Sequence, residues 1–244
     1  KDKNSFLRFP IVQNTLHPAH YSLSSKYFNF LKDKDIYLKY LSKCSVESPV
    51  GNPFADLNYK LSSPLLIQHA HHLYTILTSF NIEIDHLESI FEYGAGYGSF
   101  SRLLKNSGFR NTHIIYDLEF MTLLQKMYLK SVFNDGVNKN TGNLDNINWI
   151  SRIEDVLRLD IENKENSLFI ATWSLSETPL DVRDKFIPII KKHKYIFITY
   201  QRDFYETDNV SYFKNFKSEI DTHEWNHYEC KFFKNNFYLI GTKK

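Results

Sequence analysis

The sequence predicts an α/β fold built on a doubly wound, largely parallel sheet, and three observations support this prediction. Near-continuous apolar runs recur in the second half of the chain, as expected for strands that are covered on both faces. Stretches with the apolar spacing of helices alternate with these runs. The last two runs flank an Asn-Asn turn signal, which is typical of a hairpin. We therefore expect five parallel strands closed by a C-terminal antiparallel hairpin.

The composition excludes several classes of protein. The chain has 244 residues with 30 Lys and Arg against 28 Asp and Glu, and a net charge of +2 leaves no electrostatic footprint for nucleic acid. No apolar run approaches the roughly 18 residues of a membrane span. Two cysteines, Cys44 and Cys230, are too few for a disulfide framework, so a cytoplasmic, reducing location is expected. Because the first residue is Lys1, the sequence can be part of a longer protein, and its oligomeric state is left open.

The sharpest local signal is a cluster of glycines. The chain has only eight glycines, and Gly94, Gly96 and Gly98 fall within five residues. A short apolar strand over 88–93 precedes them, and an amphipathic helix follows and ends near a glycine cap at Gly108. Bare backbone between a strand and a helix N-terminus lets a nucleotide-like ligand approach closely and meet free N–H groups. This segment therefore predicts a cofactor cradle.

The next strand helps to identify the cofactor. It covers 112–116 and ends at Asp117, which is placed 19 residues after Gly98 to accept hydrogen bonds from ribose hydroxyls. The dinucleotide fingerprint requires Gly or Ala where this chain has Ser99. The observed pattern is instead E-x-G-x-G-x-G, starting at Glu92. It resembles motif I of the S-adenosylmethionine-dependent methyltransferases with a Rossmann-like fold.

Alternation of helix and strand continues to the end of the chain. Thr178 and Pro179 form a good pair for starting a helix, and Pro188 is expected to kink or end that helix. The elements expected after the second strand are a helix over 118–133, a loop over 134–146, a strand over 148–153, a helix over 154–159, strands over 167–173 and 195–200, and hairpin strands over 225–233 and 237–242.

The N-terminal third of the chain has a different sequence pattern. Apolar residues have helical spacing over 22–41 and again over 62–80, where a Ser-Pro pair opens the helix. The intervening 48–54 segment contains two prolines and a glycine and predicts an ordered turn. We expect residues 1–85 to form a helical cap on the substrate side, at the carboxyl edge of the sheet, and 86–244 to form the cofactor-binding domain.

Four segments together resemble the bacterial sugar O-methyltransferase family. They are Val50–Phe54, Phe91–Ser101, Tyr116–Glu119 and Thr172–Pro179. The resemblance runs from about residue 45 to the end of the fifth strand. It implies a Rossmann-like fold, S-adenosylmethionine as the cofactor, and methyl transfer to a sugar or sugar-nucleotide hydroxyl in the synthesis of surface polysaccharide. Methyl transfer to another small molecule is the alternative.

The predicted cofactor-binding residues lie at the carboxyl ends of the first, second and fourth strands. They are Glu92, Gly94, Ala95, Gly96, Gly98, Asp117, Leu118, Thr172, Trp173 and Ser174.

Methyl transfer to a hydroxyl needs alignment and a general base, because a sugar hydroxyl is a weak acid. Glu177 is the first candidate, since it follows the fourth strand by a few residues. It can instead cap the next helix or bind the amino end of the cofactor. His69 and His72 share a face of the helix over 62–80 and are further candidates for the base, although packing inside the helical cap is the commoner role of such histidines.

Aromatic and polar side chains supply candidates for substrate contacts. Tyr59 and Tyr97 are expected to stack on adenine or on a pyranose ring. Gln201 and Arg202 follow the fifth strand and can hydrogen-bond a sugar or an anionic group, or belong to a solvated loop. His17 and His20 lie in a segment that we cannot place.

One motif points to another enzyme class. The segment His223–His227 matches H-E-x-x-H, a zinc peptidase signature that requires a helix and a third ligand. Here it adjoins a predicted strand, so no metal is expected. A third hypothesis is that the chain is a cofactor-binding module without catalytic activity. The intact glycine cluster and Asp117 argue against it.

Overall fold

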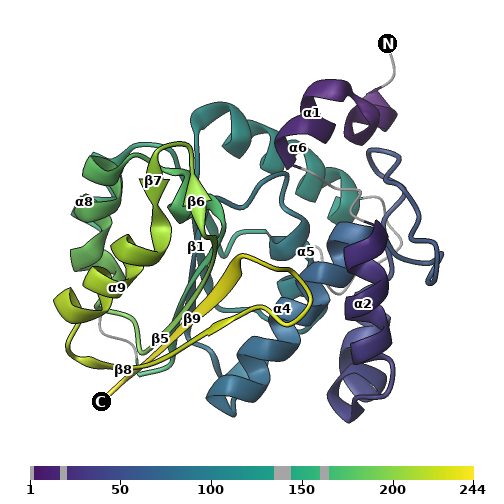
Figure 1. The fold of residues 1–244 in the computed structure, drawn as a ribbon. Helices are drawn as coiled ribbons and strands as arrows, with labels where there is room; N and C mark the ends of the chain where they lie inside the picture. The colour runs from purple at the N-terminus through teal and green to yellow at the C-terminus, as the bar shows by residue number, and fades with distance from the viewer. Residues whose placement is uncertain (1–2, 17–20, 135–143, 160–164) are drawn as a thin grey trace. The chain divides into compact units, whose positions relative to one another are not determined.

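A computed structural model describes residues 3–16, 21–134, 144–159 and 165–244 (Figure 1). The chain divides into two compact units. The helical unit comprises residues 1–84, 95–110 and 120–145, and the sheet unit comprises 85–94, 111–119 and 146–244. The chain passes from the sheet unit to the helical unit between Gly94 and Ala95, inside the glycine cluster. The predicted His17 and His20, and residues 135–143 of the predicted loop, lie outside the described residues.

The sheet unit contains a seven-stranded sheet in the order β3-β2-β1-β4-β5-β9-β8. The first five are parallel, β9 is antiparallel to β5, and β8 is antiparallel to β9. The strands are β1 (Ser89–Tyr93), β2 (Thr112–Tyr116), β3 (Ile147–Ile150), β4 (Ser167–Thr172), β5 (Tyr195–Gln201), β8 (His223–Glu229) and β9 (Asn236–Lys243). The predicted fold class is therefore confirmed. Strand order reverses between β1 and β4, which is the position where such sheets bind ligands.

Helices α8 (Leu180–Ile190) and α9 (Asn209–Glu219) cover one face of this sheet (Figure 1). Their buried aromatic and aliphatic side chains join a core cluster that includes Phe91 and Phe169, whose rings stack with centroids 5.6 Å apart. Each such fully buried apolar side chain stabilises the fold by about 1.5–3 kcal/mol. This face of the sheet is therefore a rigid base for the loops that leave β1 and β4.

One part of the sheet unit carried no secondary-structure prediction. Residues 202–222 form the two-stranded ribbon of β6 (Asp203–Phe204) and β7 (Thr207–Asp208) followed by α9. Asp208 caps α9 by accepting a hydrogen bond from the Ser211 N–H at 3.1 Å. Helix α7 (Ile153–Arg158) and β3 begin within one residue of the predicted positions.

The helix expected after Thr178 and Pro179 is present as α8, but Thr178 is not its cap. Thr178 does not cap the helix, because its hydroxyl donates to the Ser174 carbonyl at 2.8 Å. Pro179 holds the N-cap position instead, and it makes no side-chain capping hydrogen bond. Pro188 does not end α8, which runs on to Ile190. Pro188 lacks the N–H that would donate to the Asp184 carbonyl, and α8 continues for only two residues beyond it.

The helical unit holds the N-terminal helices and the two helices that follow β1 and β2. They are η1 (Lys3–Arg8), α1 (Pro10–Leu16), α2 (Tyr21–Leu31), the π-helical η2 (Tyr37–Leu41), α3 (Ser42–Cys44), α4 (Pro64–Phe80), α5 (Ser99–Asn106) and α6 (Glu119–Asn134), of which residues from Phe120 belong to this unit. A short η3 (Ile84–His86) stands at the boundary.

The single helix expected over 22–41 is wrong, and the helix expected over 62–80 is confirmed. Helix α2 ends at Leu31, because the polar run Lys32–Asp35 has no apolar side chain to bury. Helix α4 starts as predicted, with the Ser63 hydroxyl accepting from the Leu66 N–H at 3.2 Å, and it ends at Asn81 in the left-handed conformation.

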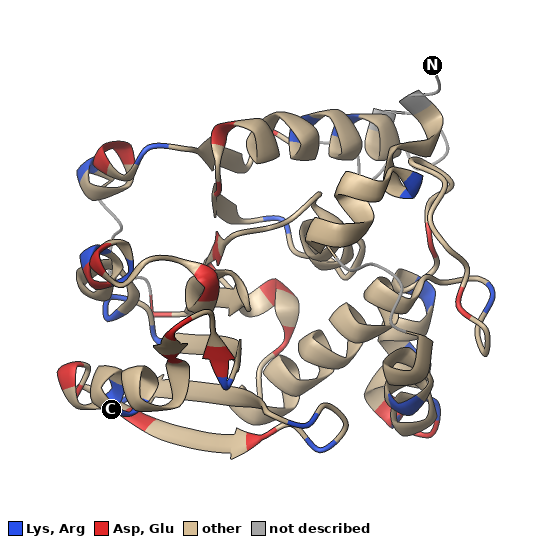
Figure 2. Cartoon of the chain, turned by 45° about the horizontal axis from the view of Figure 1, so that its top comes forward, with Lys and Arg blue, Asp and Glu red and all other residues tan. Residues whose placement is uncertain are grey.

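Two expectations from the composition concern the distribution of charged residues and the length of apolar helices. Basic and acidic residues are interspersed along the described chain (Figure 2). Within the described ranges, no helix combines the length and apolarity that crossing a membrane requires.

Candidate functional site

The glycine at the end of β1 is required by a close approach from β4. Gly94 has φ +73°, and its N–H donates to the Tyr116 carbonyl at 2.8 Å. A Cβ at this position would collide with the Ser174 Cβ and lie 2.7 Å from the Ser174 hydroxyl. That hydroxyl in turn donates to the Tyr93 carbonyl. The predicted residues Gly94 and Ser174 therefore meet at the switch point of the sheet.

Replacing Gly94 by Ala is expected to destabilise the protein by roughly 2–5 kcal/mol, from backbone strain at positive φ and from the clash with Ser174. Urea denaturation of Gly94→Ala would measure the loss. In the double variant with Ser174→Gly the clash is absent, so we expect recovery of part of this loss. Equal stability of Gly94→Ala and the wild type would contradict the packing described.

The loop after β4 is held in a strained conformation. Trp173 has φ 63° and ψ −36°, which is rare for a residue other than glycine. Its N–H donates to the Thr199 carbonyl at 2.8 Å, and its indole N–H donates to Asn236 Oδ1 at 2.7 Å. The Ser176 hydroxyl donates to the Trp173 carbonyl at 2.6 Å. Such strain persists only where surrounding contacts enforce it, and it clusters at functional sites.

Glu177 ends the short η4 (Ser174–Glu177) in this loop. Gln201, from the end of β5, accepts from the Ser176 hydroxyl at 2.8 Å and donates its amide to Glu177 Oε1 at 3.3 Å. The side chain of Glu177 remains partly open to solvent. Desolvation raises the pKa of its carboxyl, and the hydrogen bond from Gln201 opposes this shift without cancelling it. A reachable carboxylate with a raised pKa is suited to accept a proton.

Arg183 supports the same loop and was not predicted. Its guanidinium is buried, and it donates to the Thr178 carbonyl at 2.6 Å, to the Ser176 carbonyl at 2.5 Å and to Asn209 Oδ1 at 2.7 Å. These bonds tie the loop after β4 to the start of α9. Because Arg183 is a single basic residue within the apolar pattern of a helix, the sequence did not indicate this role.

At the end of β2, Asp117 is half-buried and accepts from the Leu118 N–H at 2.8 Å, while Leu118 is 62% exposed. Glu92, predicted to bind the cofactor, is 3% exposed within β1 and accepts from His113 Nε2 of β2 at 2.9 Å. In the strand register Glu92 lies opposite Ile115, and His113 reaches Glu92 from the diagonal position two residues earlier on β2, a pairing that the sequence alone did not supply. Thr172 is half-buried at the end of β4.

In the helical unit, α6 supports the remainder of the glycine cluster. Gly96 has φ +56°, and its carbonyl accepts from the buried Gln125 amide at 2.9 Å. Gly98 has φ +99° and precedes α5 as its N-cap. A Cβ there would lie 3.3 Å from Leu129. Ala95 is buried.

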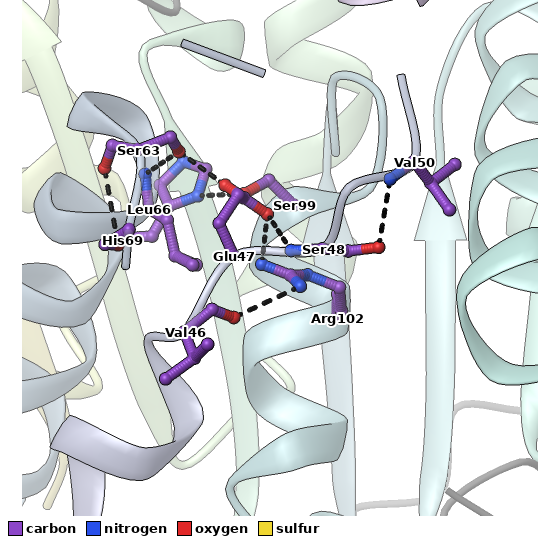
Figure 3. Close-up of polar contacts among 10 residues, drawn as sticks. Val46, Glu47, Ser48, Val50, Ser63, Leu66, His69, Ser99 and Arg102 are labelled. Carbon is purple, nitrogen blue, oxygen red and sulfur yellow. Dashed lines mark hydrogen bonds and ion pairs between the residues drawn. The ribbon is translucent and has the colours of Figure 1, made fainter. Parts of the chain in front are cut away.

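A buried ion pair fixes the start of α5 (Figure 3). Arg102 donates to Glu47 Oε1 at 2.5 Å, and the Ser63 hydroxyl donates to Glu47 Oε2 at 2.5 Å. His69 Nδ1 hydrogen-bonds the hydroxyl of Ser99, the first residue of α5, at 3.2 Å (Figure 3). Glu47 and Arg102 are 55 positions apart in the sequence, so sequence reasoning could not predict this pair.

His69 and His72 lie inside the helical unit. Burial lowers the pKa of His69 to about 3, with a smaller contribution from Arg102. Burial also lowers the pKa of His72 well below its usual range, with help from His71 and His69. The His69 ring stacks on Phe100 with centroids 5.2 Å apart. Both imidazoles are therefore neutral and weakly basic.

The candidate substrate residues have different surroundings. Tyr59 is half-buried and stacks on Phe28 with centroids 5.2 Å apart. Tyr97 is 2% exposed and packs edge-on against Tyr128, so it belongs to the core of the helical unit. Arg202 is exposed, and its guanidinium lies 5.4 Å from the Phe237 ring centre.

The H-E-x-x-H segment forms strand β8 rather than a helix. Four residues of a strand span about 13 Å, so both imidazoles cannot reach one metal ion. His223 Nε2 instead donates to the His193 carbonyl at 2.8 Å, and His227 Nε2 hydrogen-bonds the Tyr200 hydroxyl at 2.5 Å.

The sequence matches no protein-family model and no curated protein. Solved structures do resemble it. A candidate S-adenosyl-L-methionine-dependent methyltransferase from Methanococcus maripaludis has 15% identity and a TM-score of 0.50, and the match covers 91% of this chain and 93% of that one.

Two further structures are similar to this chain. The methyltransferase domain of METTL16 has 9% identity and a TM-score of 0.50, with coverage of 91% and 79% of the two chains. The methyltransferase domain of bacterial CtHen1 has 9% identity and a TM-score of 0.50, with coverage of 70% and 95%. At such identities the likeness concerns the fold alone, so the chain shares the Rossmann-like fold of these three methyltransferase structures.

Proposed function

We propose that this protein is an S-adenosylmethionine-dependent methyltransferase that acts on a sugar hydroxyl. The observation that carries the proposal is the position of Gly94 at the end of β1 and of Asp117 at the end of β2, at the carboxyl edge of the sheet beside the switch point. The fold of the solved neighbours supports the cofactor class.

The residues at the carboxyl ends of the strands suit this cofactor. We assign the ribose hydroxyls to the Asp117 carboxylate, and the contact beside adenine to the exposed Leu118. Gly94, Ala95, Gly96 and Gly98 supply bare or small backbone, and Thr172, Trp173 and Ser174, at and after the end of β4, are further proposed cofactor contacts. Glu92, the remaining candidate, is buried within β1. When bound, the cofactor supplies an electrophilic methyl group on a sulfonium.

Glu177 is assigned as the general base that takes the proton from the acceptor hydroxyl. Its raised pKa keeps the carboxylate basic enough to share a proton, and the Gln201 amide fixes the direction of Oε1. The low pKa of His69 and of His72 makes these imidazoles weaker alternatives. Tyr59, Gln201 and Arg202 are the proposed sugar contacts.

The choice of a sugar rests on the resemblance of Val50–Phe54 and Thr172–Pro179 to the sugar O-methyltransferases. Cys44 and Cys230 are both free, which fits a reducing cytoplasm where sugar nucleotides are made. Transfer of labelled methyl to a panel of sugar nucleotides, with catechols and simple alcohols alongside, tests this choice. Labelling of the catechols alone would shift the proposal to another small-molecule acceptor.

Calorimetry against S-adenosylhomocysteine and NAD tests the cofactor. We expect binding of the former only, and Asp117→Ala should weaken it by about 1–3 kcal/mol, because hydrogen bonds to a charged acceptor are lost. Asp33→Ala, which removes an exposed carboxylate from the turn after α2, is the control and should bind normally. Tighter binding of NAD would overturn the assignment.

A further inference from the structure

The N-terminal segment Ser5–Leu16 docks on the turn Val50–Phe54, the turn that the sequence singled out without explaining. The Leu7 N–H donates to the Gly51 carbonyl at 3.1 Å. Arg8 donates through Nε to the Asn52 carbonyl at 2.5 Å and through Nη2 to the Pro53 carbonyl at 3.0 Å. Its guanidinium carbon also lies 3.6 Å from the centre of the Phe54 ring. One arginine therefore engages three consecutive residues of the turn.

The glycine of this turn is required by the docked segment. Gly51 has φ +82°, and a Cβ there would lie 2.6 Å from Phe6 Cε1 and 2.9 Å from Leu7 Cγ. Phe6 and Leu7 are 6% and 2% exposed, so they form a buried anchor. The turn therefore has the shape of a socket for these two side chains.

The same segment reaches the glycine cluster. The Phe6 ring lies edge-on to Tyr97, the residue between Gly96 and Gly98, with centroids 6.2 Å apart. At the end of α1, Leu16 Cδ2 lies 3.5 Å from where a Cβ of Gly96 would be. None of the described residues Pro10–Leu16 is buried, although the segment is anchored at Phe6 and Leu7. An otherwise exposed helix thus places one leucine over the bare backbone of Gly96.

We infer that the segment Ser5–Leu16, held by Arg8 on the turn Val50–Phe54, is a wall of the cofactor site, with Leu16 as its contact residue at Gly96. This inference rests on the proposed cofactor. An apolar side chain beside Gly96 adds van der Waals contact to a ligand that is bound there. Arg8 is a positioning residue, because it acts through the segment that carries Leu16.

The contact is tested by calorimetry with S-adenosylhomocysteine on the full chain. Leu16→Ala should raise Kd by about tenfold, because about two of the three carbons that it removes would lose their contact with the ligand. Ile11→Ala removes a side chain that is 73% exposed on the same helix, and it should leave Kd within about twofold of the wild type. Equal Kd values for Leu16→Ala, Ile11→Ala and the wild type would overturn the role of Leu16.

The anchor is tested by amide hydrogen exchange over residues 9–16 without ligand. Arg8→Ala should speed exchange there by about tenfold or more and raise the Kd of S-adenosylhomocysteine, and Arg8→Lys, which lacks the planar fork, should restore only part of both. Unchanged exchange in Arg8→Ala would overturn the anchor. A wild type that binds no S-adenosylhomocysteine would instead refute the proposed function and the wall together, while the exchange result would still decide whether the segment docks.

Discussion

Lowering the pH from 7.5 to 5.0 is expected to reduce the free energy of unfolding by several kcal/mol. Burial lowers the pKa of His69 and of His71 to about 3, and that of His193 to about 4. In the unfolded chain these groups titrate near 6.5. Below that pH the unfolded state binds more protons than the folded state, so stability is complete above about 6.5 and is lost progressively as the pH falls toward 3–4.

The size of the effect follows from the linkage relation. At pH 5.0 each of these groups costs about 2 kcal/mol, since the pH lies about 1.5 units below the unfolded pKa and each unit is about 1.4 kcal/mol. The three groups together give roughly 6 kcal/mol, which is a large share of the 5–15 kcal/mol that stabilises a typical domain. Urea denaturation at a series of pH values measures it directly.

A pair of variants separates the buried histidines from other titrating groups. His71 packs against the rings of Tyr27 and Phe30, with centroids 4.4 and 5.3 Å away, so His71→Phe keeps an aromatic ring and removes the proton site. It should reduce the acid-dependent loss by about 2 kcal/mol. His86→Gln, at an exposed position, should change nothing. A stability that stays constant between pH 7.5 and 5.0 would mean that these imidazoles are hydrated.

Local patterns predicted the sheet well because its signals are short in sequence. Apolar runs located β1, β2, β4 and β5, and the Asn-Asn turn located the final hairpin. The break after Leu31 was missed because apolar spacing continued on both sides of a polar turn. Thr178 was wrongly predicted to cap α8. Its hydroxyl donates instead to the Ser174 carbonyl, and this hydrogen bond depends on the fold of the whole loop.

The candidate site also contains residues that local sequence patterns could predict and contacts that they could not. Gly94 and Asp117 could be chosen from spacing, since a strand, a turn and the next strand lie within 30 residues. Contacts between segments that are distant in sequence could not be predicted from spacing. They include the buried ion pair Glu47–Arg102 and the hydrogen bonds of Arg183. Helical spacing placed His69 and His72 on one face, but it could not show how deeply α4 is buried.

Replacing Glu177 by Gln is expected to lower kcat by about 10² to 10⁴, the usual contribution of a general base. Gln keeps the shape of the side chain and the contact with the Gln201 amide, but it cannot accept a proton. The affinity for S-adenosylhomocysteine should stay within a few-fold. Because the base must be deprotonated, the rate of the wild type should fall as the pH drops through the raised pKa of Glu177, and this limb should vanish in Glu177→Gln.

The matched control is Glu206→Gln, which neutralises an exposed carboxylate between β6 and β7 and should leave kcat unchanged. Measuring kcat at saturating S-adenosylmethionine beside the Kd of S-adenosylhomocysteine separates two roles for Glu177. A loss confined to kcat identifies the base, since proton transfer is the only step that the substitution removes. A loss confined to affinity would make Glu177 a ligand of the cofactor's amino group, and the proton would then have to pass to another group, with His69 and His72 the next to be replaced.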